Sequence, residues 1–474
     1  MIPMALKRYL QTLQFNQKEL VSSNEIFELR DKIKQLESIV YLTDITSLRD
    51  LIKLKHVELK STLARFLEKA SIEDASPAVA HRLSKSVLQQ KESELRAFLT
   101  RTLGPHWKFD GYPSRYFFDM TQAISLDYVT GIQRVVREIA REGSRLGVLI
   151  PAFVVGKDVF FLPSSGGQLE RVIFRPADTF ILPDASWNYS DEVRRAMRTA
   201  KLGGAKTVSI VYDLVPLSFP DTCPPGLPFH FSRWFHTCLI KSDQVVCISR
   251  TVADETANYI DRLGVQNAPT ISWFHLGSDL VDAGHVEKEI TDQLSLLPSP
   301  VVLAVGTIEP RKGYDVLLDA MENLWDLRYE AQLVIVGRYG WASHLLEKRI
   351  ANHEEFGKRL RWFNSASDAA VSALYRMSHT LVCASISEGF GLPIVEAARI
   401  GLPSIVSDIP VFREICGDDA IYFEAGCDDS LTHRLTECIK GEKRCPHINL
   451  LTWEQSTALL LQRIICSGES GLSV

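Results

Sequence analysis

The chain has 474 residues, of which 46% are hydrophobic and 23% are charged, so its composition is that of a globular protein rather than a disordered one. The length predicts two or three domains. The formal net charge of −5 excludes a general electrostatic attraction to nucleic acid, so any basic site has to be local.

The cysteines and the N-terminus indicate where the protein works. Nine cysteines form no CxxC pair, and their odd number suits reduced thiols in a cytoplasm better than a disulfide framework or a zinc site. The first residues, MIPMALKRYLQTLQF, lack the apolar core and cleavage site of a signal peptide, and nowhere do 18 apolar residues follow one another. We expect a soluble cytoplasmic protein, with peripheral contact to the inner face of the cytoplasmic membrane left open.

Residues 1–110 are predicted to form a helical N-terminal region. One apolar stripe in it has a spacing of four, three and four residues: Leu29, Ile33, Leu36 and Val40. The following segment is basic on balance, with charges that include Lys53, Lys55, Lys60 and Arg65. A helical hairpin that packs or forms a homodimer is the favoured interpretation, and docking on a membrane surface is the alternative.

After the turn-rich stretch GPHWKFDGYP, residues 111–285 alternate between short apolar runs and helical patterns. The apolar runs are YFFDM, LIPAFVV, DTFILP, TVSIVYDLVPL, QVVCIS and PTISWFHLG. The segment TGIQRVVREIAREGSRLG is predicted to be a helix. Strands that alternate with helices indicate βαβ units and a parallel sheet, so this region is predicted to be a Rossmann-like domain.

Residues 298–450 repeat the pattern with the runs VVLAVG, QLVIVG, RLRWF, TLVCAS, LPSIVSD and AIYFEA. Continuous apolar runs are typical of strands that are covered on both faces. The sequence therefore predicts an α/β fold of two tandem Rossmann-like domains that face each other across a cleft. The last helix, LTWEQSTALLLQRII within residues 451–474, is predicted to brace the two domains.

Two strand ends in the second domain carry the residues expected to bind a ligand, because ligands of doubly wound sheets collect at the carboxyl ends of the strands. The first strand ends at Gly306, and Arg311 and Lys312 stand just before the next helix. Two adjacent cations suit a diphosphate, Arg as a bidentate fork and Lys as a point charge. A solvated charged loop is the alternative.

The second strand end is the stretch SEGFGLPIVEA. Gly389 and Gly391 let the backbone approach a ligand closely. Glu388 and Glu396 are expected to stay ionised beside a helix N-terminus and the two cations. They therefore suit acceptors for sugar hydroxyls better than the acid and base pair of a glycoside hydrolase. The alternative for Glu396 is that it only complements the helix dipole.

The spacing E-x7-E in this stretch, preceded by GTIEPRKG and followed by GLPSIVSDIPVFREICGDDAIYF, resembles the retaining, nucleotide-sugar-dependent glycosyltransferases of family 4, which have the GT-B fold. The resemblance extends from about residue 301 to residue 426, and FDMTQ, TGIQRVVREI and VYDLVPL more faintly resemble the family's N-terminal domain. The first hundred or so residues are not covered. The chain is most similar to bacterial enzymes that build O-antigen, capsule or other surface polysaccharides, many of them mannosyltransferases.

The resemblance implies a role for each matching residue. Glu388 would lie against the transferred sugar, with the backbone N–H groups of the next three residues near the sugar and the diphosphate, and Glu396 would accept from the ribose hydroxyls. Lys312 matches the family's phosphate-binding lysine, and Arg311 would share its work. The donor-binding positions implied or expected here are Gly306, Thr307, Gly389, Phe390, Gly391, Leu392 and Glu396.

On the acceptor side, Thr130 and Gly131 match a loop that in the family faces the cleft near the diphosphate and the acceptor. This loop opens the helix that carries Arg134. Thr130 is also a good N-cap residue, so helix initiation and a role in the site can hold at once.

Two positions depart from the family's pattern. Thr307 stands where the wider family often has Arg, so that Arg311 has to supply the second cation or the grip on phosphate is weaker. Tyr212 stands before Asp213 where many relatives have His. A catalytic role for Asp213 and a structural one, in which it caps the turn before Pro216, both remain open.

No D-x-D pair, the metal-binding motif of metal-dependent transferases, occurs in the sequence. We therefore expect transfer without a metal or a cofactor. The resemblance implies a nucleotide-sugar donor, with GDP-mannose favoured by analogy, and a glycan or lipid-linked glycan as the acceptor. Arg311, Lys312 and the helix N-terminus near Leu392 would stabilise the leaving diphosphate. The alternatives are a sugar-nucleotide epimerase and a non-catalytic GT-B scaffold, whereas a dehydrogenase would need the GxGxxG motif that is missing after the first strand.

Overall fold

The computed structural model describes residues 77–109, 113–124, 131–183, 185–279, 300–340, 344–441 and 448–466. The chain separates into two compact units, Met1–Ser93 and Glu94–Val474. Most of the predicted helical N-terminal region, including its apolar stripe and its basic segment, lies outside the described residues. The part that is described is one long helix, α4 (Pro77–Leu103). The predicted domain boundaries remain predictions.

The first sheet has eight strands in the order β4-β3-β2-β1-β5-β6-β7-β8. The strands are β1 (Tyr116–Asp119), β2 (Leu149–Val155), β3 (Asp158–Phe161), β4 (Glu170–Arg171), β5 (Thr179–Leu182), β6 (Lys206–Val211), β7 (Gln244–Cys247) and β8 (Thr270–Trp273). All pairs from β2 through β1 to β8 are parallel, as the alternation of strands and helices predicts. The longer helices of this part are α5 (Gly131–Arg145), α6 (Ser190–Leu202), α8 (Leu227–Thr237) and α9 (Arg250–Arg262). A short helix, α7 (Val215–Ser218), follows β6.

The edge of the first sheet differs from the predicted all-parallel arrangement. β3 pairs antiparallel with β2, and β4 pairs antiparallel with β3. Only Gly156 and Lys157 separate the last residue of β2 from the first of β3, and Gly156 has a φ of 64°. A two-residue connection can join only antiparallel strands, because a parallel pair needs a long crossover. The sequence analysis missed this hairpin because it looked for strands that alternate with helices.

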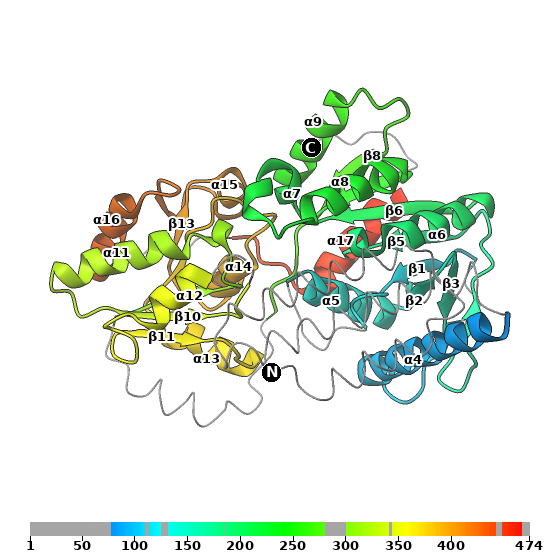
Figure 1. The fold of residues 1–474 in the computed structure, drawn as a ribbon, viewed down its shortest axis with the longest axis horizontal. Helices are drawn as coiled ribbons and strands as arrows, with labels where there is room; N and C mark the ends of the chain where they lie inside the picture. Colours follow the sequence, from blue (N-terminus) through cyan, green and yellow to red (C-terminus); the bar gives the residue numbers. More distant parts are fainter. Residues whose placement is uncertain are drawn as a thin grey trace, which may run out of the picture. The chain divides into compact units, whose positions relative to one another are not determined.

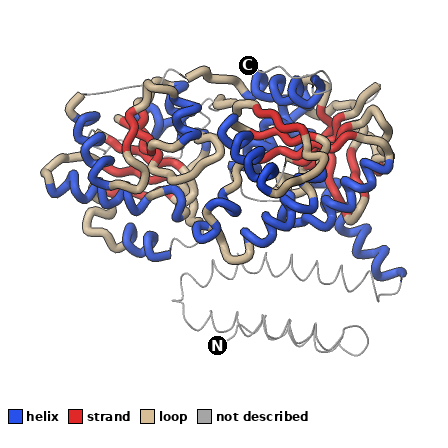
Figure 2. Tube along the Cα trace, turned by 90° about the horizontal axis from the view of Figure 1, so that it is seen from above, coloured by secondary structure: helices blue, strands red, loops and turns tan. Residues whose placement is uncertain are grey.

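The second sheet has six strands, all parallel, in the order β11-β10-β9-β12-β13-β14. They are β9 (Val301–Val305), β10 (Gln332–Val336), β11 (Leu360–Phe363), β12 (Thr380–Cys383), β13 (Ser404–Ser407) and β14 (Ile421–Phe423). Each of the six apolar runs predicted for this region contains one of these strands. The helices are α11 (Tyr314–Asp326), α12 (His344–Ala351), α13 (Asp368–Met377), α14 (Leu392–Arg399), α15 (Pro410–Cys416) and α16 (Asp428–Ile439). Figure 2 shows helices on both faces of the strands.

The strand order positions the site. β9 lies at the centre of the second sheet and pairs with β10 on one side and β12 on the other. The order of the strands reverses between β9 and β12, and such a switch point is where doubly wound sheets bind ligands. The two strand ends singled out in the sequence, after β9 and after β12, are therefore neighbours.

The last helix among the described residues, α17 (Trp453–Ile465), returns to the first sheet (Figure 1). The Lys206 ammonium donates to the carbonyl of Ile464, and the Gln244 amide donates to the carbonyl of Arg463. Because α17 follows the last strand and helix of the second domain along the chain, these bonds tie the segment after that domain to the first sheet.

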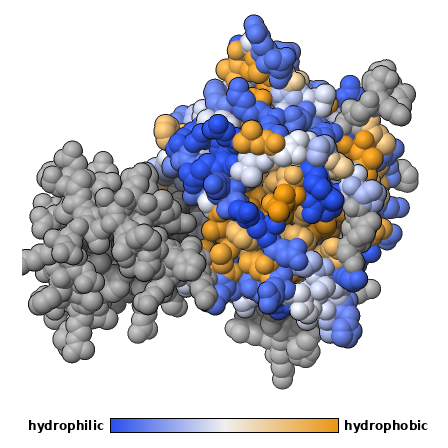
Figure 3. Space-filling model, turned by 90° about the vertical axis from the view of Figure 1, so that its right-hand side faces the viewer, coloured by the Kyte–Doolittle hydropathy of each residue, from blue (hydrophilic) through white to orange (hydrophobic). Residues whose placement is uncertain are grey.

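In the view of Figure 3, hydrophilic and hydrophobic residues are interspersed over the described surface. Within the described part of the chain, no helix is both long enough and apolar enough to cross a membrane.

Candidate functional site

The turn after β9 is held in place by its glycines and by Tyr314. Gly313 has a φ of 64° and precedes α11, and a side chain there would collide with the carbonyl oxygen of Ala384. The Tyr314 hydroxyl donates to the carbonyl of Gly306 over 2.6 Å. The turn between them, Pro310–Lys312, is a short 3-10 helix that ends with the two predicted cations.

The turn after β12 packs directly against the first. The backbone N–H of Ile386 donates to the carbonyl of Arg311 over 2.9 Å, which joins the two turns. Gly391, with a φ of 99°, precedes α14, and Pro393 occupies its first turn, where the absent N–H costs nothing. The turns after β9 and β12, which follow neighbouring strands, are thus in direct backbone contact.

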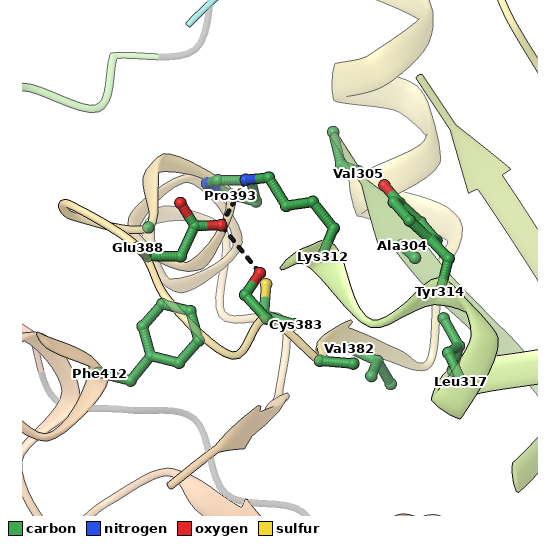
Figure 4. Close-up of a pocket in the computed structure, with 13 residues that line it drawn as sticks. Ala304, Val305, Lys312, Tyr314, Leu317, Val382, Cys383, Glu388, Pro393 and Phe412 are labelled. Atoms are coloured by element: carbon green, nitrogen blue, oxygen red, sulfur yellow. Dashed lines mark hydrogen bonds and ion pairs between the residues drawn. The ribbon is translucent and has the colours of Figure 1, made fainter. Parts of the chain in front are cut away.

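Glu388 lies between the two cations. Its carboxylate is paired with the Lys312 ammonium and, over 2.9 Å, with the Arg311 guanidinium, and it accepts a hydrogen bond from the Ser385 hydroxyl over 2.8 Å. Figure 4 shows Lys312 and Glu388 pointing toward each other at the pocket. Burial alone would raise the pKa of the Glu388 carboxyl, but the charges of Lys312 and Arg311 lower it to about 2. The residue is therefore an acceptor rather than an acid at neutral pH, as expected.

Arg311 is held from several sides. Its Nε lies 3.2 Å from the carboxylate of Glu309, and its Nη1 also donates to the carbonyl of Ser387 over 3.1 Å. Burial opposes the charge of the guanidinium, yet the surrounding carboxylates, Glu388 first, raise its pKa above the ordinary value. A cation held this firmly is preorganised for an anionic ligand.

Asp213 follows β6 of the first sheet and lies within electrostatic reach of this cluster. Its carboxylate accepts from the backbone N–H of Val215 over 3.1 Å, which is the turn-capping role that the sequence left open. Burial raises the pKa of the Asp213 carboxyl, and the charge of Arg311 partly opposes that rise. Both predicted roles of Asp213 are compatible with this position.

Glu396 is buried in the first turns of α14, with 3% of its surface exposed. It accepts from the Tyr375 hydroxyl over 2.9 Å and pairs with the Arg134 guanidinium over 2.6 Å. Burial first, and then the charge of Glu396, raise the pKa of the Tyr375 hydroxyl, which therefore remains a donor. The pair brings together Arg134, predicted on the acceptor side, and Glu396, predicted on the donor side.

At Gly389 a loop of the second sheet lies close against loops of the first. A side chain there would collide with the carbonyl oxygen of Tyr212 and with the Ile248 side chain. The carbonyl of Gly389 itself accepts from the Ser249 hydroxyl over 2.8 Å. Glycine is needed at this position because of a close backbone contact.

The remaining predicted residues are less central. Phe390 is buried, Leu392 and Thr307 are half-buried, and Gly131 is exposed at the start of α5. Thr130 lies outside the described residues. Gly391 and Lys312 line the pocket together with Glu388, whereas Gly306 and Thr307 are not in its lining, which consists of Ala304, Val305, Lys312, Tyr314, Leu317, Val382, Cys383, Ala384, Ser385, Glu388, Gly391, Pro393 and Phe412.

Sequence reasoning missed three residues that the structure brings into contact with predicted site residues. Ser385 contacts Glu388, Glu309 contacts Arg311, and Tyr375 contacts Glu396. Ser385 and Glu309 stand in the two strand-end stretches and could have been named from their positions. Tyr375 lies on α13, and nothing in its neighbourhood along the chain signals a contact with α14.

The comparisons with known proteins agree with this geometry. Residues 286–449 match the family described as "Glycosyl transferases group 1". The serotype-specific mannosyltransferase WbdA of Escherichia coli is 31% identical over 434 residues, which cover 84% of this chain and 51% of that protein. The O-antigen chain mannosyltransferase B of Escherichia coli is 27% identical over 225 residues, covering 47% of this chain and 59% of the relative. This chain thus spans about half the length of these curated relatives.

Two solved structures show the fold. Sucrose-phosphate synthase from Thermosynechococcus elongatus superposes with a TM-score of 0.54 at 16% identity, covering 76% of this chain and 100% of that one. HepE from Anabaena, solved with UDP and glucose, superposes with a TM-score of 0.51 at 13% identity, covering 74% of this chain and 95% of that one. The predicted GT-B arrangement of two Rossmann-like sheets is confirmed.

Proposed function

We propose that this chain, which carries a group 1 glycosyltransferase domain on a GT-B fold, transfers mannose from a nucleoside-diphospho-mannose to a glycan or lipid-linked glycan with retention of configuration. GDP-mannose is the favoured donor, and assembly of O-antigen or capsule is the favoured setting. Two features support the proposal: the similarity to bacterial mannosyltransferases, and the ionised Glu388 between Lys312 and Arg311 at the switch point of the second sheet.

The cations in the cluster have donors left for a diphosphate. An ammonium has three N–H donors, and Glu388 takes one donor of Lys312. A guanidinium has five, and the Nη2 group of Arg311 is used in none of the contacts given above. Glu388 therefore holds both cations in position without exhausting them. We infer that the leaving diphosphate binds on their open side, where the turn before α14 adds backbone N–H groups.

The transfer then needs no protein nucleophile. The acceptor hydroxyl attacks the anomeric carbon on the face that the diphosphate leaves, the bond from that carbon to the phosphate oxygen breaks, and the hydroxyl proton passes to the departing phosphate. Glu388 is well suited to accept from a sugar hydroxyl, since its low pKa keeps it deprotonated. Arg311 and Lys312 stabilise the charge that grows on the phosphate, so we propose a reaction that proceeds without a divalent metal.

The cellular setting follows from the substrates. An acceptor carried on a lipid would place the enzyme in the cytoplasm at the inner face of the membrane. Contact with that membrane, or formation of a homodimer, is proposed for the N-terminal region, which lies outside the described residues.

The proposal is tested by measuring nucleoside diphosphate release from GDP-, UDP- and dTDP-sugars in the presence of EDTA, with a lipid-linked glycan extract as acceptor. We expect turnover of GDP-mannose by the wild type and a loss of about 100-fold in Lys312→Met. Lys348→Met is the matched control, since Lys348 is exposed on α12.

Each other outcome identifies an alternative. Turnover that stops in EDTA and returns with Mg²⁺ would contradict the metal-independent reaction. Conversion of the donor sugar without release of nucleoside diphosphate would indicate an epimerase. No turnover of any donor, with no thermal stabilisation by any nucleotide, would indicate a scaffold protein.

A further inference from the structure

A glutamate on α15, a helix of the second domain, caps the N-terminus of α9, a helix of the first domain. Glu414 on α15 accepts from the backbone N–H groups of Arg250 and Thr251, over 2.8 Å and 2.7 Å, at the start of α9. It also accepts from the Thr251 hydroxyl over 2.6 Å. The first N–H groups of a helix have no partner within the helix, so a carboxylate at this end satisfies them and complements the helix dipole.

A further group completes this contact. The His275 ring nitrogen Nε2 lies 2.7 Å from the Glu414 carboxylate. Burial alone would raise the pKa of Glu414, but the hydrogen bonds from His275, from Thr251 and from the helix backbone lower it to about 2. Glu414 is therefore charged at neutral pH and engaged by four donors, all of them from residues of the first sheet's domain.

The same end of α9 reaches the turn that carries Glu388. Ser249, the N-cap of α9, accepts from the backbone N–H of Val252 and donates to the carbonyl of Gly389. The ring of His275 packs on the ring of Phe390, with 5.5 Å between the centroids. Two consecutive residues of the turn are thus contacted from this side: Gly389 by the N-cap residue of the helix that Glu414 caps, and Phe390 by His275, which itself contacts Glu414.

We propose that Glu414, Ser249 and His275 form an interdomain clamp that positions the Glu388–Phe390 turn for donor binding. The inference rests on the proposed function and adds positioning residues to it. Glu388 immediately precedes the clamped residues, so a shift of the turn moves its carboxylate away from Arg311 and Lys312. The clamp also sets the position of the first sheet's loops relative to the donor, because all four donors that contact Glu414 among the described residues come from that side.

The first arm of the test does not depend on activity. Amide hydrogen exchange is followed in peptides that cover residues 249–253 and 386–391, in wild type, Glu414→Gln and Ser249→Ala. Loss of a hydrogen bond to a charged group is expected to speed exchange about tenfold or more in both peptides of Glu414→Gln. Glu437→Gln is the matched control, because Glu437 is also ion-paired but contacts Arg434 and His433 on its own helix.

The second arm measures the donor kinetics of the two variants and of the double variant. We expect kcat/KM for the donor to fall about tenfold in each single variant. The double variant should be no less active than the less active of the two single variants, because both residues act through one clamp. Ser249→Ala keeps the inference testable if Glu414→Gln folds poorly.

Three results are distinguishable. Faster exchange in residues 249–253 alone would overturn the clamp, because Glu414 would then be only a local cap. Losses that add in the double variant would overturn it as well. If the wild type turns over no donor, the proposed function fails, while coupled exchange of the two peptides would still establish the clamp.

Discussion

Two carboxylates of the second domain, Glu388 and Glu414, have their pKa lowered to about 2 by different means. Glu388 is held by cationic side chains from the same sheet, on turns that follow neighbouring strands. Glu414 is held mostly by uncharged donors at the end of a helix from the other sheet. We propose the first arrangement as a binding site for an anionic ligand and the second as a joint between two domains. A lowered pKa alone does not distinguish the two purposes, and the identity of the donors does.

The largest effect is expected from Glu388→Gln, which removes the carboxylate and leaves Arg311 and Lys312 facing a neutral amide. Turnover should fall by about 100- to 1,000-fold if Glu388 contacts the transferred sugar in the transition state. Binding of the product nucleoside diphosphate should be retained or become tighter, because both cations are freed for phosphate. Kinetics together with calorimetric titration of GDP would check this.

Glu437→Gln, an ion-paired glutamate on α16, serves as the control. A Glu388→Gln enzyme that kept its turnover would contradict the role assigned to Glu388. Loss of both turnover and GDP binding would contradict it as well.

An intermediate effect is expected from Gly389→Ala. Gly389 follows Glu388 directly and also contacts Ser249 of the first sheet's domain. The added methyl group would collide with the carbonyl of Tyr212, and overpacking of this kind costs about 1 to 3 kcal/mol. We expect a loss of roughly 10- to 100-fold in kcat/KM from this strain. Gly166→Ala, where a methyl group meets no neighbour, should have no effect. Equal activities of the two variants would show that the close contact is not required.

The smallest effect on turnover, but a distinct pH dependence of stability, is expected from Glu414→Gln. The pKa of Glu414 falls from 4.5 to about 2 on folding, so its contribution is complete above about pH 5 and is lost as the pH falls toward 2. At pH 7 the free energy of unfolding of the variant should be about 2 kcal/mol lower than that of wild type. This difference should disappear as the pH is lowered.

Urea unfolding of wild type and Glu414→Gln at pH 7, 5 and 3 would measure that difference. A gap between wild type and variant that stays constant from pH 7 to pH 3 would show that the Glu414 charge does not stabilise the folded state.

Much of the second domain was determined by the sequence itself. Its six strands are short apolar runs that can only be buried, and the positions of Arg311, Lys312 and Glu388 at strand ends made their meeting predictable. That inference holds because parallel strands bring their carboxyl ends to one edge of a sheet, whatever the distance along the chain.

Only the tertiary structure decided the contacts between the two sheets. Glu414 lies 164 residues from Arg250, and the pair between Arg134 and Glu396 likewise spans two domains. Such pairs leave no periodic signal in the sequence, because a surface glutamate on a helix looks the same whether it meets water or another helix. The local sequence pattern determines whether each segment forms a helix or a strand. The packing of one domain on the other determines which charged side chains form contacts between them.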